Sequence, residues 1–327
     1  MRLVILGAGA IGGVVAGHLA RAARDVMVLA RGEHLAAIRA HGLRVDTPSG
    51  PFIAQPAVAD PSAPIAWRDD DVLVVAVKTQ DLGGALRTVA PPPWIPIVCM
   101  TNGVEAERIA LRHAREVYGV CVMMSASYLV PGRVQVWGAP LPGLLDLGRY
   151  PDGAGELGDE LVGELIVAGF AAEVRTNIMK WKRGKLLANL ANAAEAVSGR
   201  AARSSEVIAR AKLEARACYA AANLSCITEA EDAARRGDYR EVDIAGETRT
   251  GSSTYQSFAK GHALEIDYLN GEIAMLGRLH GVATPVNEAL QAIAAEAGRT
   301  GAHAGALPLA ELEAKIEIHA ARSALRR

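Results

Sequence analysis

Three glycines near the start of the chain have the spacing of a phosphate-binding turn. Gly7, Gly9 and Gly12 follow the apolar run 3–6 and precede a helical pattern, so the G-x-G-x-x-G motif lies in its strand–turn–helix context. We expect Gly7 to permit the turn, Gly9 to let the backbone approach a pyrophosphate, and Gly12 to let the helix pack on the strand. N–H groups of the first helical turn would bind phosphate oxygens. The predicted dinucleotide contacts are Gly7, Ala8, Gly9, Ala10, Ile11 and Gly12.

Two other interpretations of this stretch are weaker. A glycine-rich turn in an unrelated α/β fold would show the same motif. An N-terminal signal peptide would need a continuous apolar segment, and here glycines interrupt the run that follows Arg2.

The second predicted strand, residues 25–31, ends in a basic residue. Units that bind NAD place an Asp or Glu near this point, where it accepts hydrogen bonds from the ribose 2′-OH. Arg31 stands there instead, and its guanidinium would pair with a 2′-phosphate. We therefore predict NADP(H) rather than NAD(H). The alternative is a solvated surface arginine, and Glu33 is the one nearby acid that would weaken the pairing.

Polar residues follow three further apolar runs that are typical of buried parallel strands. The runs are 71–77, 95–100 and 117–124. The carboxyl ends of parallel strands form the edge where open α/β sheets bind their ligands. We therefore predict ligand contacts at this edge, with simple loop capping as the alternative. The predicted contacts are Lys78, Asn102 and Ser125.

A second group of polar residues has helical spacing. Lys185, Asn189 and Asn192 follow the i, i+4, i+7 pattern, which places them on one stripe of a helix predicted for 179–197. Because asparagine is a poor residue for a helix interior, we interpret the stripe as a polar wall that faces a cleft. A stripe that faces solvent is the alternative. A lysine partly removed from water in a cleft is suited to proton donation.

A third group lies further along the chain. Ser252 and Ser253 belong to a hydroxyl-rich turn, and they could cap a helix or present hydroxyl and N–H groups to a carboxylate. Glu265 could cap a helix, pair with a surface lysine or reach a cleft. The residue pattern alone does not choose among these roles.

The elements that must position these residues fall into two regions. Strand and helix patterns alternate up to about residue 175, and helical patterns alone follow. We predict an α/β, Rossmann-type dinucleotide-binding domain over 1–175 and an all-helical domain over 176–327. Two Pro- and Gly-rich stretches, 42–58 and 131–155, are expected to form a hairpin-like excursion and a hairpin that completes the sheet. The predicted helices of the second domain are 179–197, 204–222, 257–279, 286–297 and 309–325.

Composition excludes several classes of protein. The chain has 327 residues, of which 50% are hydrophobic and 22% charged, enough for two domains with substantial cores. A formal net charge of −1 argues against a nucleic-acid partner. No segment approaches the ~20 apolar residues of a membrane span. The four cysteines match no zinc or redox spacing, so we expect no metal, reduced thiols and a soluble cytoplasmic protein. Whether Ala-rich helices form a homodimer or pack among themselves stays open.

Taken together, these motifs resemble those of the ketopantoate reductase family (2-dehydropantoate 2-reductases). The resemblance runs nearly end to end and implies a Rossmann domain followed by a helical domain. It also implies hydride transfer from NADPH to the C2 carbonyl of a small 2-oxo acid, 2-dehydropantoate, which gives pantoate. The residues that carry the resemblance are Gly7–Gly12, Arg31, Lys78–Gln80, Asn102–Gly103, Lys185, Asn189, Ser252–Ser253 and Glu265–Gly271.

The resemblance also implies roles for individual residues. Lys185 resembles the family's proton donor, and Glu265 resembles the acid near the nicotinamide ribose and the catalytic lysine. Asn189 and Asn102 resemble amides that orient the substrate, and Ser253 resembles the serine that binds its carboxylate. The implied cofactor contacts in these segments are Lys78, Asn102, Ser125 and Glu265, and the implied substrate contacts are Asn102, Lys185, Asn189, Asn192 and Ser253.

The chain departs from the family pattern on the substrate side. The second helix asparagine usually falls eight residues after the lysine, where this chain has Ala193, and Asn192 is the nearest substitute. Arg203 stands roughly where a further asparagine is expected, and Ser257 where an aspartate often follows the serine turn. These departures leave two enzymatic alternatives, a reductase of another branched 2-oxo acid and an opine-type dehydrogenase. A non-catalytic NADPH sensor is less favoured, because a sensor needs no proton donor such as Lys185.

Overall fold

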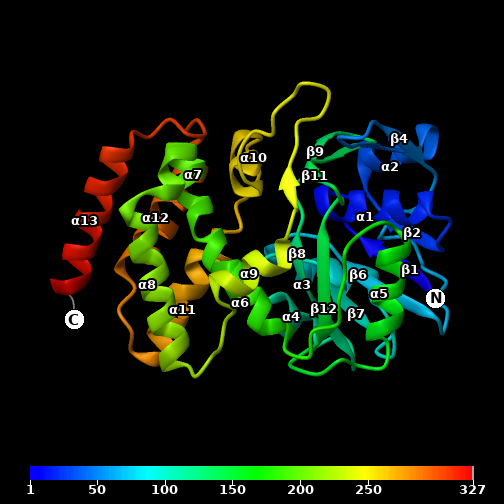
Figure 1. Cartoon of the computed structure of the whole chain (residues 1–327), viewed down its shortest axis with the longest axis horizontal. Coiled ribbons are helices and arrows are strands. Elements are labelled where there is room, and N and C mark those ends of the chain that lie inside the picture. The colour runs from blue at the N-terminus through cyan, green and yellow to red at the C-terminus, as the bar shows by residue number, and fades with distance from the viewer. Residues whose placement is uncertain (326–327) are drawn as a thin grey trace. The chain divides into compact units, whose positions relative to one another are not determined.

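The first strand lies inside a seven-stranded sheet in the computed structural model, which describes residues 1–325 (Figure 1). The strand order is β12-β8-β7-β6-β1-β2-β5, and only the β12–β8 pair is antiparallel. The order reverses beside β1, which is the switch point where such sheets bind ligands. The strands are β1 (Arg2–Leu6), β2 (Val26–Leu29), β5 (Ala57–Ala59), β6 (Asp71–Val75), β7 (Ile97–Cys99), β8 (Val117–Met123) and β12 (Leu144–Arg149).

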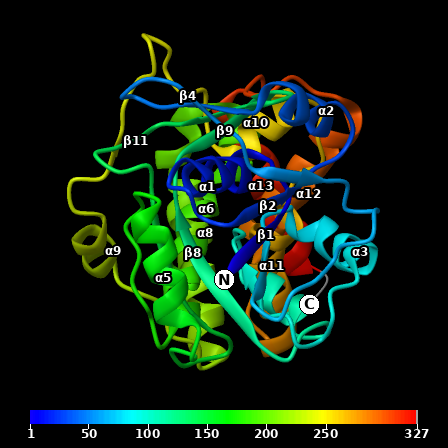
Figure 2. The ribbon, with the colours of Figure 1, turned by 90° about the vertical axis from the view of Figure 1, so that its right-hand side faces the viewer.

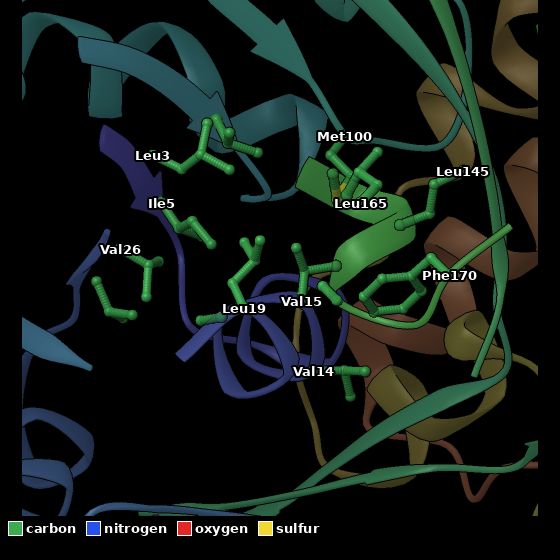
Figure 3. Packing of buried hydrophobic residues seen from close by; sticks show 14 of the residues in the cluster. Leu3, Ile5, Val14, Val15, Leu19, Val26, Met100, Leu145, Leu165 and Phe170 are labelled. Carbon is green, nitrogen blue, oxygen red and sulfur yellow. The ribbon is translucent and has the colours of Figure 1, made fainter. Parts of the chain in front are cut away.

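Alternate side chains of β1 enter two different hydrophobic clusters. Leu3 and Ile5 pack with α1 (Ala10–Arg21) on one face of the sheet, as Figure 3 shows, whereas Val4 and Leu6 pack with α3 on the other. Figure 2 shows α1 and α3 on opposite sides of β1. Because both faces are covered, the central runs 3–6 of β1, 72–75 of β6 and 97–99 of β7 are apolar, as the sequence predicted. The other helices that pack with the sheet are α2 (Gly32–His41), α3 (Thr79–Val89), α4 (Ala106–Ala110) and α5 (Gly158–Val167).

A second, smaller sheet covers α1. Its order is β4-β3-β10-β9, and two glycines of α1 allow the close approach, because a Cβ at Gly17 or Gly13 would press against Val45 or Val134. The predicted hairpin over 42–58 is confirmed as the antiparallel pair β3–β4, while β5 joins the main sheet. The small-sheet strands are β3 (Leu43–Asp46), β4 (Phe52–Ala54), β9 (Ala126–Val130) and β10 (Arg133–Val136).

The stretch 131–155 differs in part from the prediction. Its strand β12 pairs with β8 and completes the main sheet, as expected. Its strand β10 instead joins the small sheet, where it pairs with β9 and runs parallel to β3. The hairpin partner of β12 is therefore β8 and not another strand of the same stretch.

The chain divides into two compact units. The first comprises Met1–Lys182 together with Glu229–Arg249, and the second comprises Arg183–Thr228 and the residues from Thr250 onward. We predicted a boundary near residue 175, whereas the units divide after Lys182 and one later segment returns to the first unit. Within that segment β13 (Arg240–Glu241) pairs with β11 (Gly138–Ala139), and two hydrogen bonds from Arg235 to the buried Asp146 add an ion pair. This segment begins with α9 (Glu229–Arg236).

The second unit is helical, as predicted. A cluster of small and aliphatic side chains from α7, α8, α12 and α13 forms its core. Among residues 1–325 no helix is both long and apolar enough to span a membrane. The helices are α6 (Ile178–Asn189, whose first residues belong to the first unit), α7 (Ala191–Ser198), η1 (Arg200–Ser204), α8 (Glu206–Ala221), α10 (Ser253–Ala259), η2 (Ile266–Tyr268), α11 (Asn270–His280), α12 (Pro285–Thr300) and α13 (Leu309–Leu325).

Three of the five predicted helices are confirmed and two differ. The prediction over 179–197 is interrupted at Leu190, whose carbonyl accepts a hydrogen bond from the Asn270 side chain at 3.3 Å. The prediction over 257–279 is wrong, because α10 ends near Lys260. Gly261 has φ +67°, and the Gly261 and His262 amides donate back to the carbonyls of Phe258 and Ser257. That pattern is a Schellman stop, which a helix cannot pass. The confirmed predictions are 204–222, 286–297 and 309–325.

Candidate functional site

The glycine turn follows β1 at the switch point of the sheet. Gly7 has φ +105°, and a Cβ there would lie 3.0 Å from the Val77 amide nitrogen that follows β6. A Cβ at Gly12 would collide with the carbonyl oxygen of Gly7 and with Ala76. A Cβ at Gly9, in contrast, would meet no atom within 4 Å. Two of the glycines are therefore required by the fold, and Gly9 leaves open space beside the backbone.

The amino end of α1 has no side-chain cap. Gly9 is the residue before the helix, and the first turn carries no acidic residue. The first helical turn of any helix has N–H groups without intrahelical partners, and they carry the positive end of the helix dipole. This end of α1 is suited to bind a phosphate group.

A cavity of about 770 Å³ opens beside this turn. Its volume is typical of a small-molecule site. Among the predicted residues it is lined by Gly7, Ala8, Gly9 and Arg31. The other predicted contacts of this unit do not line it, namely Ala10, Ile11, Gly12, Lys78, Asn102 and Ser125. Lining residues that the sequence did not indicate include His34, Arg87 and Tyr128, and Gln80 of the segment Lys78–Gln80 also lines the cavity.

Arg31 precedes α2 and is exposed at the cavity. Asp60 lies near enough to Arg31 for the two charges to interact. Hydrogen bonds from Ser62 lower the pKa of the Asp60 carboxyl, and the positive charges of Arg31 and Arg39 lower it further. Arg31 itself is exposed, so its guanidinium is accessible to a ligand.

His34 holds the glycine turn in place. Its Nδ1 accepts a hydrogen bond from the Gly132 amide at 2.8 Å, so Nε2 carries the proton and donates it to the Ala8 carbonyl at 2.8 Å. Burial lowers the pKa of this imidazole. The ring also meets Tyr128 edge-on, with ring centres 5.0 Å apart. A single histidine one turn into a helix has no periodic signal, so the sequence could not reveal this role.

Two loops at the carboxyl edge of the sheet lie next to each other. Lys78 precedes α3, and the Thr79 hydroxyl donates a hydrogen bond to the Asn102 carbonyl at 3.5 Å. The predicted residues Lys78 and Asn102 therefore belong to adjoining turns. Both polar side-chain atoms of Gln80 are buried and have no hydrogen-bond partner in the described part of the chain. A ligand that enters the cavity would meet this amide.

Ser125 lies away from that cavity and contacts the segment that returns to the first unit. Its hydroxyl donates a hydrogen bond to Glu241 at 2.5 Å, and its amide donates one to the Tyr239 hydroxyl at 3.0 Å. The predicted cofactor role of Ser125 stays a prediction.

The polar stripe of the second unit is partly removed from water. Lys185 is half-buried, Asn189 is 9% exposed and Asn192 is 4% exposed. A solvent-facing stripe would leave the asparagines accessible, so the stripe is not of that kind. Asn270, which belongs to the segment Glu265–Gly271, stabilises the stripe because its side-chain amide donates a hydrogen bond to the Leu190 carbonyl directly after Asn189.

A network of hydrogen bonds joins the stripe to the serine turn. Arg203 Nη1 donates to Asn192 Oδ1 at 2.9 Å and to Glu195 Oε2 at 2.8 Å. The Ser252 amide donates to the same Glu195 oxygen at 3.2 Å. Arg203 and Glu195 thus connect the predicted substrate residue Asn192 to the turn that contains Ser253.

The serine turn and Glu265 are placed at the starts of short helices. The Ser252 hydroxyl caps α10 by accepting a hydrogen bond from the Tyr255 amide at 3.3 Å, while the Ser253 side chain is exposed. Glu265 is half-buried before η2, and its carbonyl accepts the Tyr268 amide at 3.0 Å. The capping role that the sequence left open therefore belongs to Ser252, and Ser253 is accessible to a ligand.

Two family models match the chain. The model described as ketopantoate reductase PanE/ApbA matches residues 3–152, and the model of that family's C-terminal region matches residues 177–297. The chain belongs to the ketopantoate reductase family. It is thus an oxidoreductase with a nicotinamide dinucleotide as cofactor and a small keto acid as substrate, which confirms the resemblance and the fold class expected from the sequence.

Relatives in the ketopantoate reductase family align with almost the whole length of this chain. The 2-dehydropantoate 2-reductase of Mesorhizobium japonicum is 30% identical over 326 residues, which cover 90% of this chain and 96% of the relative. A solved PanE/ApbA family ketopantoate reductase from Ralstonia eutropha JMP134 is 28% identical with a TM-score of 0.78, covering 92% and 99%. A D-mandelate dehydrogenase solved with NADH and anilino(oxo)acetate shares the fold, with a TM-score of 0.79 at 22% identity and coverage of 92% and 99%.

Proposed function

We propose that this member of the ketopantoate reductase family uses NADPH to reduce 2-dehydropantoate to pantoate. The observation that carries the proposal is the polar stripe, in which half-buried Lys185 is followed by the nearly buried amides of Asn189 and Asn192. A reductase of a 2-oxo acid needs a proton donor and hydrogen-bonding groups on the substrate, and this stripe supplies both types of side chain.

The residues of the first unit fit a phosphorylated dinucleotide. The uncapped start of α1 and the open space at Gly9 suit a pyrophosphate. The exposed Arg31 at the cavity suits the 2′-phosphate that distinguishes NADPH from NADH. The Gln80 amide, which has no hydrogen-bond partner among residues 1–325, would gain one on the ligand. Lys78 and Asn102 are proposed as further cofactor contacts from the adjoining turns.

We assign the proton-transfer role to Lys185. The bound cofactor supplies the hydride that is added to C2 of the substrate. Negative charge then grows on the carbonyl oxygen, where the Lys185 ammonium stabilises it and donates the proton that completes the hydroxyl group. Asn189, Asn192 and Ser253 are proposed to hold the substrate, and Glu265 to support the lysine.

A steady-state assay with NADPH and a panel of 2-oxo acids tests this proposal. We expect turnover with 2-dehydropantoate, measured as the loss of NADPH absorbance. Turnover with another branched 2-oxo acid alone would move the assignment to a related reductase. NADPH binding without turnover on any acid of the panel would contradict the proposal and favour a sensor.

One observation favours the second candidate, a reductase of a different 2-oxo acid. Arg203 joins Asn192 where the family pattern has an asparagine, so the substrate side of this chain is chemically altered. The D-mandelate dehydrogenase of the same fold acts on a 2-hydroxy acid with a different side chain, judged by its name. The panel therefore includes aromatic and dicarboxylic 2-oxo acids beside the branched aliphatic ones.

A further inference from the structure

Only one nitrogen of the Arg203 guanidinium makes hydrogen bonds to other residues in the described part of the chain. Nη1 makes both of its hydrogen bonds, to Asn192 and Glu195. Nε and Nη2 make no hydrogen bond to any residue in the described part of the chain, and the side chain is 35% exposed. Arg203 therefore presents two nitrogens with unused N–H groups beside the predicted substrate residues.

The open edge has the geometry of a carboxylate site. Nε–H and Nη2–H point in the same direction along the side edge of a planar guanidinium, and together they match the two oxygens of a carboxylate. A lysine or an amide at this position could not offer two parallel charged donors. The chemistry of the free edge thus points to a planar anion as its ligand.

The partners of Arg203 hold this edge in a fixed direction. Glu195 and Asn192 are 3% and 4% exposed, so the two acceptors that orient the guanidinium are themselves packed into the unit. The Glu195 carboxylate also accepts the Ser252 amide, which places the serine turn beside the arginine. Side-chain entropy is already lost before a ligand arrives, so less binding free energy is spent on ordering the arginine.

We propose that Arg203 binds the carboxylate of the 2-oxo acid substrate through Nε and Nη2, and that Glu195, together with Oδ1 of the proposed substrate residue Asn192, positions Arg203. This inference rests on the proposed function and adds a specificity-determining residue to it. The task that the family resemblance gives to Ser253 is then shared with, or taken over by, a residue from η1. Substrates that lack an ionised carboxylate lose this contact.

Two variants and a matched control test the inference. Arg203→Gln removes the charge and the pair of parallel N–H donors, whereas Arg203→Lys keeps the charge without that pair. Arg200→Gln, the control, changes an exposed arginine of the same short helix. The probe is oxamate, an analogue of a 2-oxo acid that resists hydride reduction, titrated calorimetrically into the NADPH-saturated protein. Charged hydrogen bonds of this kind predict a dissociation constant about 10- to 100-fold higher for Arg203→Gln. We expect a smaller rise for Arg203→Lys and a change within about twofold for Arg200→Gln.

Substrate esters separate a direct contact from a structural effect. For the best acid of the panel, Arg203→Gln should raise KM about 10- to 100-fold, but it should leave KM for the methyl ester of that acid almost unchanged. Equal losses for acid and ester would overturn the inference, as would oxamate binding that depends on Ser253 and not on Arg203. If Arg203→Gln does not fold, Arg203→Lys carries the same comparison.

The outcomes distinguish this inference from the proposed function. Oxamate binding that depends on Arg203, in a protein that turns over no 2-oxo acid, supports the carboxylate site and contradicts the reductase. Turnover of 2-dehydropantoate that is insensitive to Arg203→Gln supports the reductase and overturns the carboxylate site. An NADPH-saturated wild-type protein that does not bind oxamate also overturns it.

Discussion

Lys182 and Glu107 form an ion pair that is almost completely removed from water. Lys182 Nζ lies 2.5 Å from Glu107 Oε1 and 3.1 Å from the Thr101 carbonyl oxygen, and the two side chains are 2% and 0% exposed. The second carboxylate oxygen of Glu107 is buried without a partner in the described part of the chain. The pair thus ties the start of α6 to α4 and to the turn that contains Asn102.

Loss of either partner should destabilise the first unit strongly. Lys182→Met or Glu107→Gln leaves the other group charged and unpaired in the interior, which costs about 3–5 kcal/mol of the free energy of unfolding. Chemical denaturation measures this difference. Lys180→Met is the matched control on the same helix, because its ion pair with Glu231 is partly exposed and is worth less than about 1 kcal/mol. A loss at Lys182 no larger than at Lys180 would refute the buried-pair argument.

The two glycines at the start of α1 should respond differently to alanine. Gly9→Ala adds a methyl group in open space, so the midpoint of thermal unfolding should not change, while NADPH binds at least about tenfold more weakly because the methyl group blocks the pyrophosphate. Gly12→Ala forces a collision with the Gly7 carbonyl and should lower the midpoint itself. Fluorescence titration of NADPH and thermal unfolding measure the two effects. If Gly9→Ala bound NADPH with wild-type affinity, the pyrophosphate would not lie against the backbone at Gly9.

Arg31 should set the preference for NADPH. Arg31→Ala removes a charged partner of the 2′-phosphate, and KM for NADPH should rise about 10- to 100-fold while KM for NADH changes little. Arg39→Ala is the control, since Arg39 is exposed on α2, the helix that Arg31 precedes, and does not line the cavity. An equal effect of Arg31→Ala on both cofactors would exclude the phosphate contact.

His18 should make the stability of the protein depend on pH below neutrality. Burial lowers the pKa of His18 to about 4, and its Nδ1–H donates to the Ala168 carbonyl at 3.2 Å. The unfolded chain, with a histidine pKa of about 6.5, binds the proton more readily, so stability is complete above pH ~6.5 and is lost as pH falls toward 4. The loss between pH 7 and pH 5 should be about 2 kcal/mol.

The measurement is denaturant unfolding at both pH values for the wild type and for His18→Gln. The variant should lack this part of the pH dependence, whereas His41→Gln, which changes an exposed histidine, should retain it. A pH dependence that is identical in the wild type and in His18→Gln would contradict the assignment.

Local patterns in the sequence predicted the nucleotide-binding half well. The run before Gly7 is apolar throughout because both faces of β1 are covered, and the glycine spacing follows from contacts over a few residues. Features of this kind depend on residues that are close together in the sequence. They can therefore be predicted without knowing which distant residues contact them.

Features that depend on distant partners could not be predicted. Glu229–Arg249 returns to the first unit through a two-residue strand and a bond from Arg235 to Asp146, neither of which has a periodic signal. The break at Leu190 depends on Asn270, which is 80 residues away. Arg203 stood out only as a departure from a family pattern, and its pairing with Glu195 needed the structure.

The most direct test of the account is a comparison of kcat and NADPH affinity in Lys185→Ala. If Lys185 donates the proton, kcat for the best 2-oxo acid should fall about 10²- to 10⁴-fold, because general acid catalysis is lost. The dissociation constant for NADPH should stay within about twofold of the wild type, and Lys180→Ala on the same helix should leave kcat unchanged. A Lys185→Ala variant that keeps wild-type kcat, or that loses NADPH binding together with activity, would contradict the assignment of Lys185 as proton donor.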